Sequence, residues 1–334
     1  MAFVIDSSEW SFNTCNREGV IVVVENFLDA LGRITERGET FWLGKDFHTR
    51  DMFMGLALWS LFHKDSGLDL PFELSQELAG YFNKAPYYED EPDWPAEFAL
   101  GSDVDIDGSG LVQNYDVLWA HSLVKNNRAC GCIGLFREGR YLTTANGHRE
   151  GLHWIISEQS QIKFWRAAID VQGDSPATLR SLAPHAYPNT FFPDSVWRGC
   201  ARFNGGYHSQ SRELRRYLEV FDDHGYWVFT ASPPAELLSD PVNEVNHDAP
   251  SRQLIERRFL LLNLSVAPEN PDVYADIDCR EARMLDLEGT KFYCEWHGKL
   301  QAWQNRVHIH PPVSQSKNKI IVGFMAGHLP LPND

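Results

Sequence analysis

Six polar residues near the end of the chain have the types and the spacing to transfer protons and to bind an anion. They are Glu295, His297, Lys299, Arg306, His308 and His310. Histidine has an unperturbed pKa near physiological pH, so histidines beside a substrate can take up and release its protons. A cationic pair next to such histidines suits them to proton transfer on a phosphodiester.

Two neighbouring β-strands would bring these six side chains onto one face of a sheet. The segments TKFYCEWHGKL (290–300) and RVHIHPP (306–312) alternate polar and apolar residues, as side chains on the two faces of a strand do. An antiparallel pairing keeps the apolar residues on one face only if the two residue numbers of each opposed pair add up to an odd number. One such register pairs Lys299 with Arg306, His297 with His308, and Glu295 with His310.

Three interpretations of this face are open. Because directly opposed like charges destabilise a sheet, Lys299 beside Arg306 indicates a bound anion and an acid–base site, or side chains that splay into water. An antiparallel sheet also commonly has one solvated face, for which these residue types are ordinary. Thirdly, His297, His308 and His310 could hold a metal ion. The acid–base site is the working hypothesis, with no metal and no cofactor.

The charge of the chain is unevenly distributed. The 334 residues carry a net charge of −16, which argues against broad, nonspecific nucleic-acid binding. Residues 290–334 contain five lysines and arginines and two acidic residues, so this segment is +3 and the remainder is −19. Any anion-binding role is therefore expected in the C-terminal segment.

Length and composition indicate a globular protein with two domains. The chain is long enough for two cores, and 43% of its residues are hydrophobic. It has no run of 18 apolar residues, and its first residues lack the pattern of a signal peptide. Six scattered cysteines are expected to be reduced thiols. We expect a cytoplasmic protein without a membrane partner.

The first hundred residues predict mainly helices, and mixed structure follows them. Apolar spacing of three and four residues predicts helices in 22–31, 52–62 and 72–82. Further helices are expected in 114–127, 164–170, 178–187 and 211–223, and near 252–264. Strands are expected in 132–136, 140–144 and 152–157, with 226–232 as a further candidate.

The C-terminal region predicts a small antiparallel sheet. Residues 281–287 lead into a turn at Glu288-Gly289, and the three strands 290–300, 306–312 and 319–332 follow. Four prolines between Pro233 and Pro250 mark a boundary region. The expected fold class is α+β, with an α+β domain of unknown role in 1–240 and a helix plus a four-stranded antiparallel sheet in 251–334.

The strands CEWHGKL, NRVHIH and IIVGFMAGHLP resemble the C-terminal half of ribonuclease toxins of the RelE/HigB type. The resemblance covers about 45 residues at the end of the chain. It implies a RelE-like sheet that cleaves RNA, usually mRNA on the ribosome, through attack by the 2′-hydroxyl. By position, it implies that Arg306 stabilises the phosphate and that His328 replaces a terminal basic residue. His297 and Lys299 would lie on the same surface.

Two hypotheses about function follow. The whole chain is similar to large uncharacterised bacterial proteins of mobile-element and phage-defence neighbourhoods, so the first is a cytosolic defence- or toxin-related protein. Its C-terminal domain would bind RNA or the ribosome and act as a metal-independent ribonuclease. The second is a non-catalytic subunit of an anti-phage defence complex, in which the 11 tryptophans serve partner binding.

Three shorter motifs predict ordinary structure more than chemistry. Asp103, Asp105 and Asp107 copy the start of a calcium loop, but its last ligand position holds Asn114, so a polar strand or turn is favoured. Cys130-Gly-Cys132 lacks a second pair and predicts two buried cysteines. The helix end Asp222-Asp223-His224 conflicts with the helix dipole, and an exposed end is favoured over a site.

Overall fold

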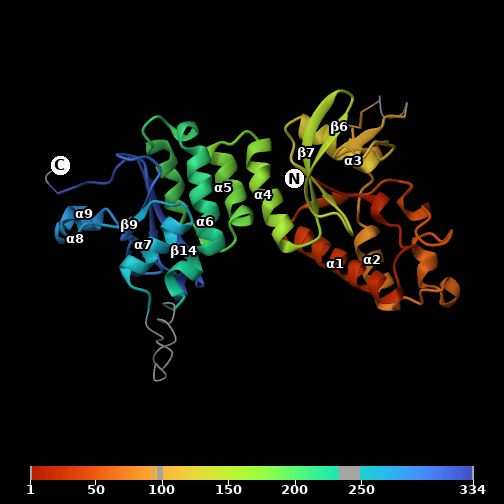
Figure 1. Cartoon of the computed structure of the whole chain (residues 1–334), viewed down its shortest axis with the longest axis horizontal. Helices are drawn as coiled ribbons and strands as arrows, with labels where there is room; N and C mark the ends of the chain where they lie inside the picture. The colour runs from red at the N-terminus through yellow and green to blue at the C-terminus, as the bar shows by residue number, and fades with distance from the viewer. Residues whose placement is uncertain (1, 93, 96–100, 233–248, 333–334) are drawn as a thin grey trace, which may run out of the picture. The chain divides into compact units, whose positions relative to one another are not determined.

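The chain folds into two compact units. The structure is a computed structural model that describes residues 2–92, 94–95, 101–232 and 249–332. The units are Met1–Gly173 and Asp174–Asp334 (Figure 1). The chain therefore divides much earlier than at the boundary expected between residues 240 and 251. Most of that boundary segment lies outside the described residues.

A seven-stranded mixed sheet forms the centre of the first unit, in the order β2-β1-β5-β7-β6-β3-β4. Its strands β2, β1, β5 and β7 are parallel neighbours, and the remaining pairs are antiparallel. The strands are β1 (Ala2–Ile5), β2 (Thr40–Trp42), β3 (Val104–Ile106), β4 (Leu111–Val112), β5 (Cys130–Ile133), β6 (Gly139–Ala145) and β7 (His148–Ile155).

Helices cover both faces of this sheet. Val4 packs with residues of α3, whereas Phe3 contacts Phe164 of α4 with ring centroids 5.0 Å apart. Because successive strand residues point to opposite faces, α3 and α4 lie on opposite sides of the sheet. The helices of this unit are α1 (Arg17–Glu36), α2 (Phe72–Phe82), α3 (Tyr115–Lys125) and α4 (Glu158–Val171).

The sequence predicted most of these elements and missed the strand that organises them. The helices expected in 22–31 and 72–82 are confirmed as parts of α1 and α2. Segment 52–62 is instead mostly irregular and ends in a 3-10 helix, Leu58–Phe62. β1 has four buried residues and no alternation, because a parallel strand covered on both faces is apolar throughout.

A buried carboxylate pair lies where β1 ends. Asp6 and Asp116 are both completely buried. Asp116 accepts hydrogen bonds from the backbone N–H of Ser7 at 2.9 Å and from the Tyr88 hydroxyl at 2.8 Å. Burial, and then the charge of Asp6, raises the pKa of Asp116 to about 7. Burial therefore keeps this carboxyl group protonated to a higher pH than an exposed aspartate.

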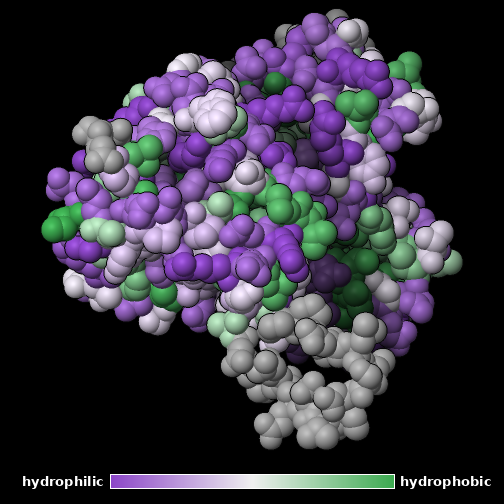
Figure 2. All heavy atoms as spheres, turned by 60° about the vertical axis from the view of Figure 1, so that its left-hand side comes forward, coloured by the Kyte–Doolittle hydropathy of each residue, from purple (hydrophilic) through white to green (hydrophobic). Residues whose placement is uncertain are grey.

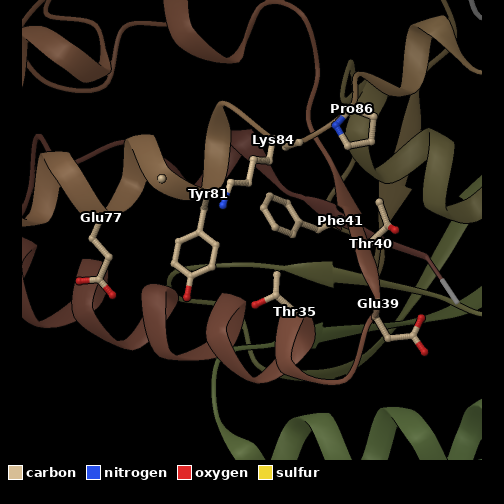
Figure 3. A pocket seen from close by; sticks show the side chains of 10 residues that line it. Thr35, Glu39, Thr40, Phe41, Glu77, Tyr81, Lys84 and Pro86 are labelled. Atoms are coloured by element: carbon tan, nitrogen blue, oxygen red, sulfur yellow. The ribbon is translucent and has the colours of Figure 1, made fainter.

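A pocket of about 580 Å³ lies beside β2, the edge strand of the sheet. Figure 3 shows Phe41, Tyr81 and Lys84 around it, with Thr35 on the neighbouring helix α1. Its charged lining residues are Glu39, Glu77 and Lys84, and its lining contains no histidine or cysteine. The pocket thus lacks the histidines that the expected acid–base chemistry requires.

A five-stranded sheet forms the centre of the second unit, in the order β8-β14-β13-β12-β9. The pairs among β9, β12, β13 and β14 are antiparallel, and β8 is parallel to β14. A separate hairpin is formed by β10 (Met284–Leu287) and β11 (Thr290–Tyr293). The sheet strands are β8 (Thr190–Phe191), β9 (Val266–Pro268), β12 (Trp296–Lys299), β13 (Arg306–His310) and β14 (Ile320–Ala326).

Helix α6 covers one face of this sheet at very short range. A Cβ atom on Gly298 would collide with the ring of Tyr217, and one on Gly225 would press against Ile320. The helices of this unit are α5 (Pro176–Ala186), α6 (Ser211–Thr230), α7 (Arg252–Leu261), α8 (Pro271–Ala275) and α9 (Ile277–Glu281) (Figure 1). Residues 226–232 continue α6 to Thr230, so the strand considered there is wrong.

Three features of the second unit differ from the expected C-terminal domain. Its sheet has a fifth strand, β8, which comes from before residue 240 and joins α5 and α6 to the same unit. The expected strand 290–300 is two strands, because the chain turns at Cys294 and Glu295 and moves from the hairpin to the sheet. The turn at Glu288-Gly289 is confirmed, with both residues at positive φ.

Candidate acid–base site

Glu269 stands at the centre of a polar cluster on the sheet face opposite α6. One of its carboxylate oxygens, Oε1, lies 2.8 Å from Nε of Arg283 and 3.5 Å from Nδ1 of both His297 and His308. The two histidines are directly opposed on β12 and β13, as the sequence predicted, and Lys299 is opposed to Arg306. The cluster therefore joins a carboxylate, a guanidinium and two imidazoles.

Backbone contacts fix the carboxylate and the guanidinium in place. Glu269 directly follows β9, and its N–H donates to the carbonyl of Glu295 at 2.9 Å. Arg283 follows α9, and its Nη1 donates to the carbonyls of Cys279 at 2.9 Å and Pro330 at 3.0 Å. Only 2% of the Arg283 side chain is exposed. Arg283 is thus a buried cation that orients Glu269.

Burial keeps both histidines neutral near pH 7. It lowers the pKa of His297 to about 4, against the opposing pull of Glu269. It lowers the pKa of His308 well below the usual value, and the neighbouring His297 and Arg283 lower it further. His308 is 1% exposed, and neither of its ring nitrogens has a hydrogen bond. A neutral imidazole can accept a proton, so the protonation state suits a base.

His297 is the histidine of the pair that a substrate could reach. Its Nδ1 atom is buried toward Glu269, yet 13% of its side chain is exposed, so the exposed part is the rest of the ring. This arrangement resembles a carboxylate–histidine dyad, in which the carboxylate orients one nitrogen and the other nitrogen faces the substrate. Tyr293 lies close by, and burial raises its pKa to about 12.

Arg306 has a structural role in place of the expected phosphate contact. Its Nη1 donates to the carbonyls of Gln301 and Gln304, each at 2.7 Å, and its Nη2 to that of Ala302 at 3.1 Å. The guanidinium therefore holds the loop between β12 and β13. Lys299 is partly exposed and is available as the cation of this pair.

Two other expected site residues lie apart from the histidine pair. The ring of His310 contacts that of Phe292 at 5.2 Å, and its Nδ1 lies 2.8 Å from the carbonyl oxygen of Pro311. β12 begins at Trp296, which is opposed to Ile309, so His310 has no partner residue on β12. His328 is exposed beyond β14, with Nδ1 2.8 Å from the carbonyl oxygen of Leu329.

The metal interpretation finds no support in the described part of the chain. Within it, no group of three or more histidine, cysteine, aspartate or glutamate residues could hold an ion. Glu295, which was expected opposite His310, lies outside β12 and pairs with Arg252 at 2.6 Å. The carboxylate that does approach the histidines, Glu269, is also held by Arg283.

No feature of the sequence marks Glu269 or Arg283 as a site residue. Glu269 lies in a polar stretch before Pro271, where an acidic residue is ordinary. Arg283 precedes the alternating residues of β10 and looks like a surface residue. Glu269 could be placed beside the histidines only if the pairing of β9 with β12 were known. That pairing is hard to predict because β9 is only three residues long.

The three shorter motifs form local structure. Asp105 accepts a hydrogen bond from the N–H of Gly110 at 2.9 Å and so closes a turn after β3. Cys130 and Cys132 are buried free thiols, as predicted. Asp222 lies within α6 and is buried, where it accepts from the N–H of Asn189 at 2.6 Å, so the exposed helix end expected there is wrong.

Comparisons of the chain with models of known protein families, with curated proteins and with solved structures found no match. None of the described helices has both the length and the apolar character needed to cross a bilayer.

Proposed function

We propose that the second unit binds single-stranded RNA and cleaves it without a metal ion, with His297 as the general base. The observation that carries this proposal is the contact between His297 Nδ1 and Glu269 Oε1 at 3.5 Å, in a ring that is neutral and partly exposed. Catalytic hydrogen bonds are often long in the absence of substrate and shorten when it binds. The resemblance to RelE-type toxins points to the same chemistry.

The proposed reaction is an internal transfer within RNA. His297 accepts the proton of a 2′-hydroxyl, and the 2′-oxygen forms a bond to the adjacent phosphorus. The bond from phosphorus to the 5′-oxygen breaks, and that oxygen takes up a proton from the solvent. The products are a 2′,3′-cyclic phosphate and a free 5′-hydroxyl. Lys299, on the same strand as His297, attracts the negatively charged phosphate.

An exposed tryptophan beside the site favours a single-stranded substrate. Trp303 lies in the loop between β12 and β13 and is 90% exposed. The carbonyls on both sides of it accept hydrogen bonds from Arg306, so the loop that carries it is held in place. Exposed aromatic rings near cations are the usual stacking platforms for unpaired bases. Trp303 would therefore stack on a base of the bound RNA.

The test is cleavage of a labelled single-stranded RNA in the presence of a chelator. The wild type should produce 2′,3′-cyclic phosphate ends, and a DNA of the same sequence should stay intact because it lacks the 2′-hydroxyl. His297→Gln should abolish cleavage, and Glu269→Gln should lower it by about 10²–10³-fold. His224→Gln, an exposed histidine on α6, is the matched control. Equal cleavage by wild type and His297→Gln would refute the proposal.

A ribonuclease of this kind fits the role of a defence or toxin-related protein in the bacterial cytoplasm. Expression of the wild type should then slow growth, and expression of His297→Gln should not. Cleavage of mRNA only when ribosomes are added would identify the ribosome as the partner. Growth inhibition of equal strength by both proteins would separate the toxicity from the proposed chemistry.

One observation favours a second candidate function, that of a non-catalytic subunit of a defence complex. Large apolar side chains are exposed near the ends of two helices that contact each other, α6 and α7. They are Tyr226, Trp227, Leu260 and Leu261. Figure 2 shows patches of hydrophobic residues, in green, on a face that is otherwise mostly hydrophilic. Loss of co-purification with a neighbour-encoded protein in Leu261→Asp, with RNA cleavage intact, would support this role.

A further inference from the structure

A second polar site lies in the first unit, far along the chain from the histidine pair. A pocket of about 300 Å³ opens between α4 and the sheet face formed by β6 and β7. Its floor is apolar, with Phe164 and Ala168 from α4 and Cys130 from β5. Its polar lining residues are Arg140, Glu150, His153 and Asp170. The pocket is large enough for a ligand that has one ring and a few further non-hydrogen atoms.

His153 is the residue that marks this pocket as a site. It is 8% exposed, lines the pocket, and has no hydrogen bond at either ring nitrogen. Its ring is 6.2 Å from that of Phe164. A buried polar group without a partner costs free energy, so such a group usually has a ligand or water as its partner. The imidazole of His153 is thus an unused hydrogen-bonding group inside the pocket.

Arg140 supplies a positive charge to the same space. It is directly opposed to His153 in the pairing of β6 with β7, so both side chains lie on one face. Its guanidinium lies over Gly151, where any Cβ atom would collide with it. Throughout the described residues, no carboxylate forms an ion pair with Arg140. Its fork of N–H groups is therefore free for an anion.

We infer that this pocket binds a small organic monocarboxylate with an apolar body. The carboxylate would accept two hydrogen bonds from Arg140 and one from an N–H of His153, and the apolar body would lie against Phe164 and Ala168. Arg140 is the cation of the lining, beside the carboxylates of Glu150 and Asp170, so a monoanion is favoured over a phosphate dianion, whose second charge both carboxylates would repel. The apolar floor excludes a bare inorganic ion as the best ligand.

Benzoate is a suitable probe for this inference, and benzamide is its neutral counterpart. Isothermal titration of the full chain with benzoate should give a Kd of about 1 mM or tighter, as expected for a ligand of this size. Benzamide and inorganic phosphate should each bind at least about tenfold more weakly. The NMR signals of the His153 ring, identified by their loss in His153→Gln, should shift during the benzoate titration.

Three variants decide whether Arg140 and its position matter. Arg140→Gln should weaken benzoate binding by about tenfold or more, because it removes the charge and the paired donors. Gly151→Ala should also weaken binding, because its methyl group displaces the guanidinium. Arg149→Gln, an exposed arginine on β7, should bind like the wild type.

Two results would overturn the inference. One is the absence of saturable benzoate binding to the wild type up to about 10 mM. The other is equal affinity of the wild type and Arg140→Gln, provided that both have the same melting temperature. Gly151→Ala serves as an independent check because it leaves the charge in place. RNA cleavage plays no part in these measurements, so the inference stands or falls separately from the proposed ribonuclease.

Discussion

The imidazole rings of His297 and His308 lie 5.7 Å apart and are tilted by 38°, as directly opposed residues of β12 and β13. Their two Nδ1 atoms are equally distant from one carboxylate oxygen of Glu269. Only His297 retains an exposed edge, whereas His308 is enclosed. The pair therefore divides its roles: His297 can meet a substrate, and His308 fills the space behind it.

The enclosed His308 should make the stability of the protein sensitive to acid. Its pKa is lowered in the folded state, so its stabilising effect is present above the unfolded value near 6.5 and is lost as the pH falls below it. The advantage of the wild type over His308→Gln in urea unfolding should fall by about 1.4 kcal/mol per pH unit between pH 6.5 and 5. A constant difference for His308→Gln would contradict the enclosed, neutral state.

Replacement of Glu269 should destabilise the fold as well as impair cleavage. Glu269→Gln leaves Arg283 as a buried cation without an anion, which typically costs about 3–5 kcal/mol. In the double variant with Arg283→Met, the cost should be smaller than the sum of the two single costs, by roughly 1 kcal/mol or more. Urea unfolding of the four proteins gives this coupling. Strict additivity would mean that the two side chains do not interact.

The pairing of β12 with β13 could be predicted from the sequence because strand geometry leaves few choices. A shift by one residue would bury His297 and His308 against α6 and expose Trp296, so parity restricts the pairing to registers with an odd sum, and the observed register is one of these. The hairpin of β10 and β11 was likewise predictable, because Glu288 and Gly289 form a turn between alternating strands.

The burial of the histidine face could not be predicted, because it depends on contacts distant in sequence. Glu269 and Arg283 reach the histidines only through the pairing of β9 with β12 and the return of the chain after α9. Without them the face looks solvated. The use of Arg306 to hold its own loop was equally hidden, since a guanidinium that binds backbone carbonyls leaves no mark on residue type.

Trp303 should contribute to RNA affinity without contributing to stability. Its ring is almost fully exposed, so its removal changes few contacts within the protein. Stacking on one base is worth about 1–3 kcal/mol, so Trp303→Ala should weaken binding of single-stranded RNA by about 5- to 150-fold. Tyr226→Ala, an exposed aromatic residue on α6, is the control and should bind RNA normally. Fluorescence anisotropy measures both, and unchanged affinity in Trp303→Ala would count against a stacking role.

Lys299 and Arg306 should respond differently to substitution although they are opposed on the sheet. Arg306→Lys loses the planar fork that holds residues 301–305 and should lower stability by roughly 1–3 kcal/mol. Lys299→Gln should leave stability unchanged and lower the salt dependence of RNA binding by about 0.7 in the slope of log K against log salt. Urea unfolding and salt titrations separate the two effects. A matching loss of stability in both variants would show that Lys299 is structural as well.

Asp116 should give the first unit a pH dependence of the opposite sign to that of His308. Its pKa is raised to about 7 in the folded state, by burial and by Asp6, so its stabilising effect is complete below the unfolded value near 3.9 and is lost as the pH rises to 7. Asp116→Asn cannot release a proton there, and its amide oxygen can still accept from the N–H of Ser7 while its NH₂ group donates to the Tyr88 oxygen. As the pH rises from 4.5 to 7.5, Asp116→Asn should therefore gain stability relative to the wild type, at up to about 1.4 kcal/mol per pH unit.

Urea unfolding at these two pH values tests the sign of this change, with the exposed Asp223→Asn as the control. A gain toward acid pH would mean that Asp116 is ionised throughout and that its hydrogen bonds outweigh its burial.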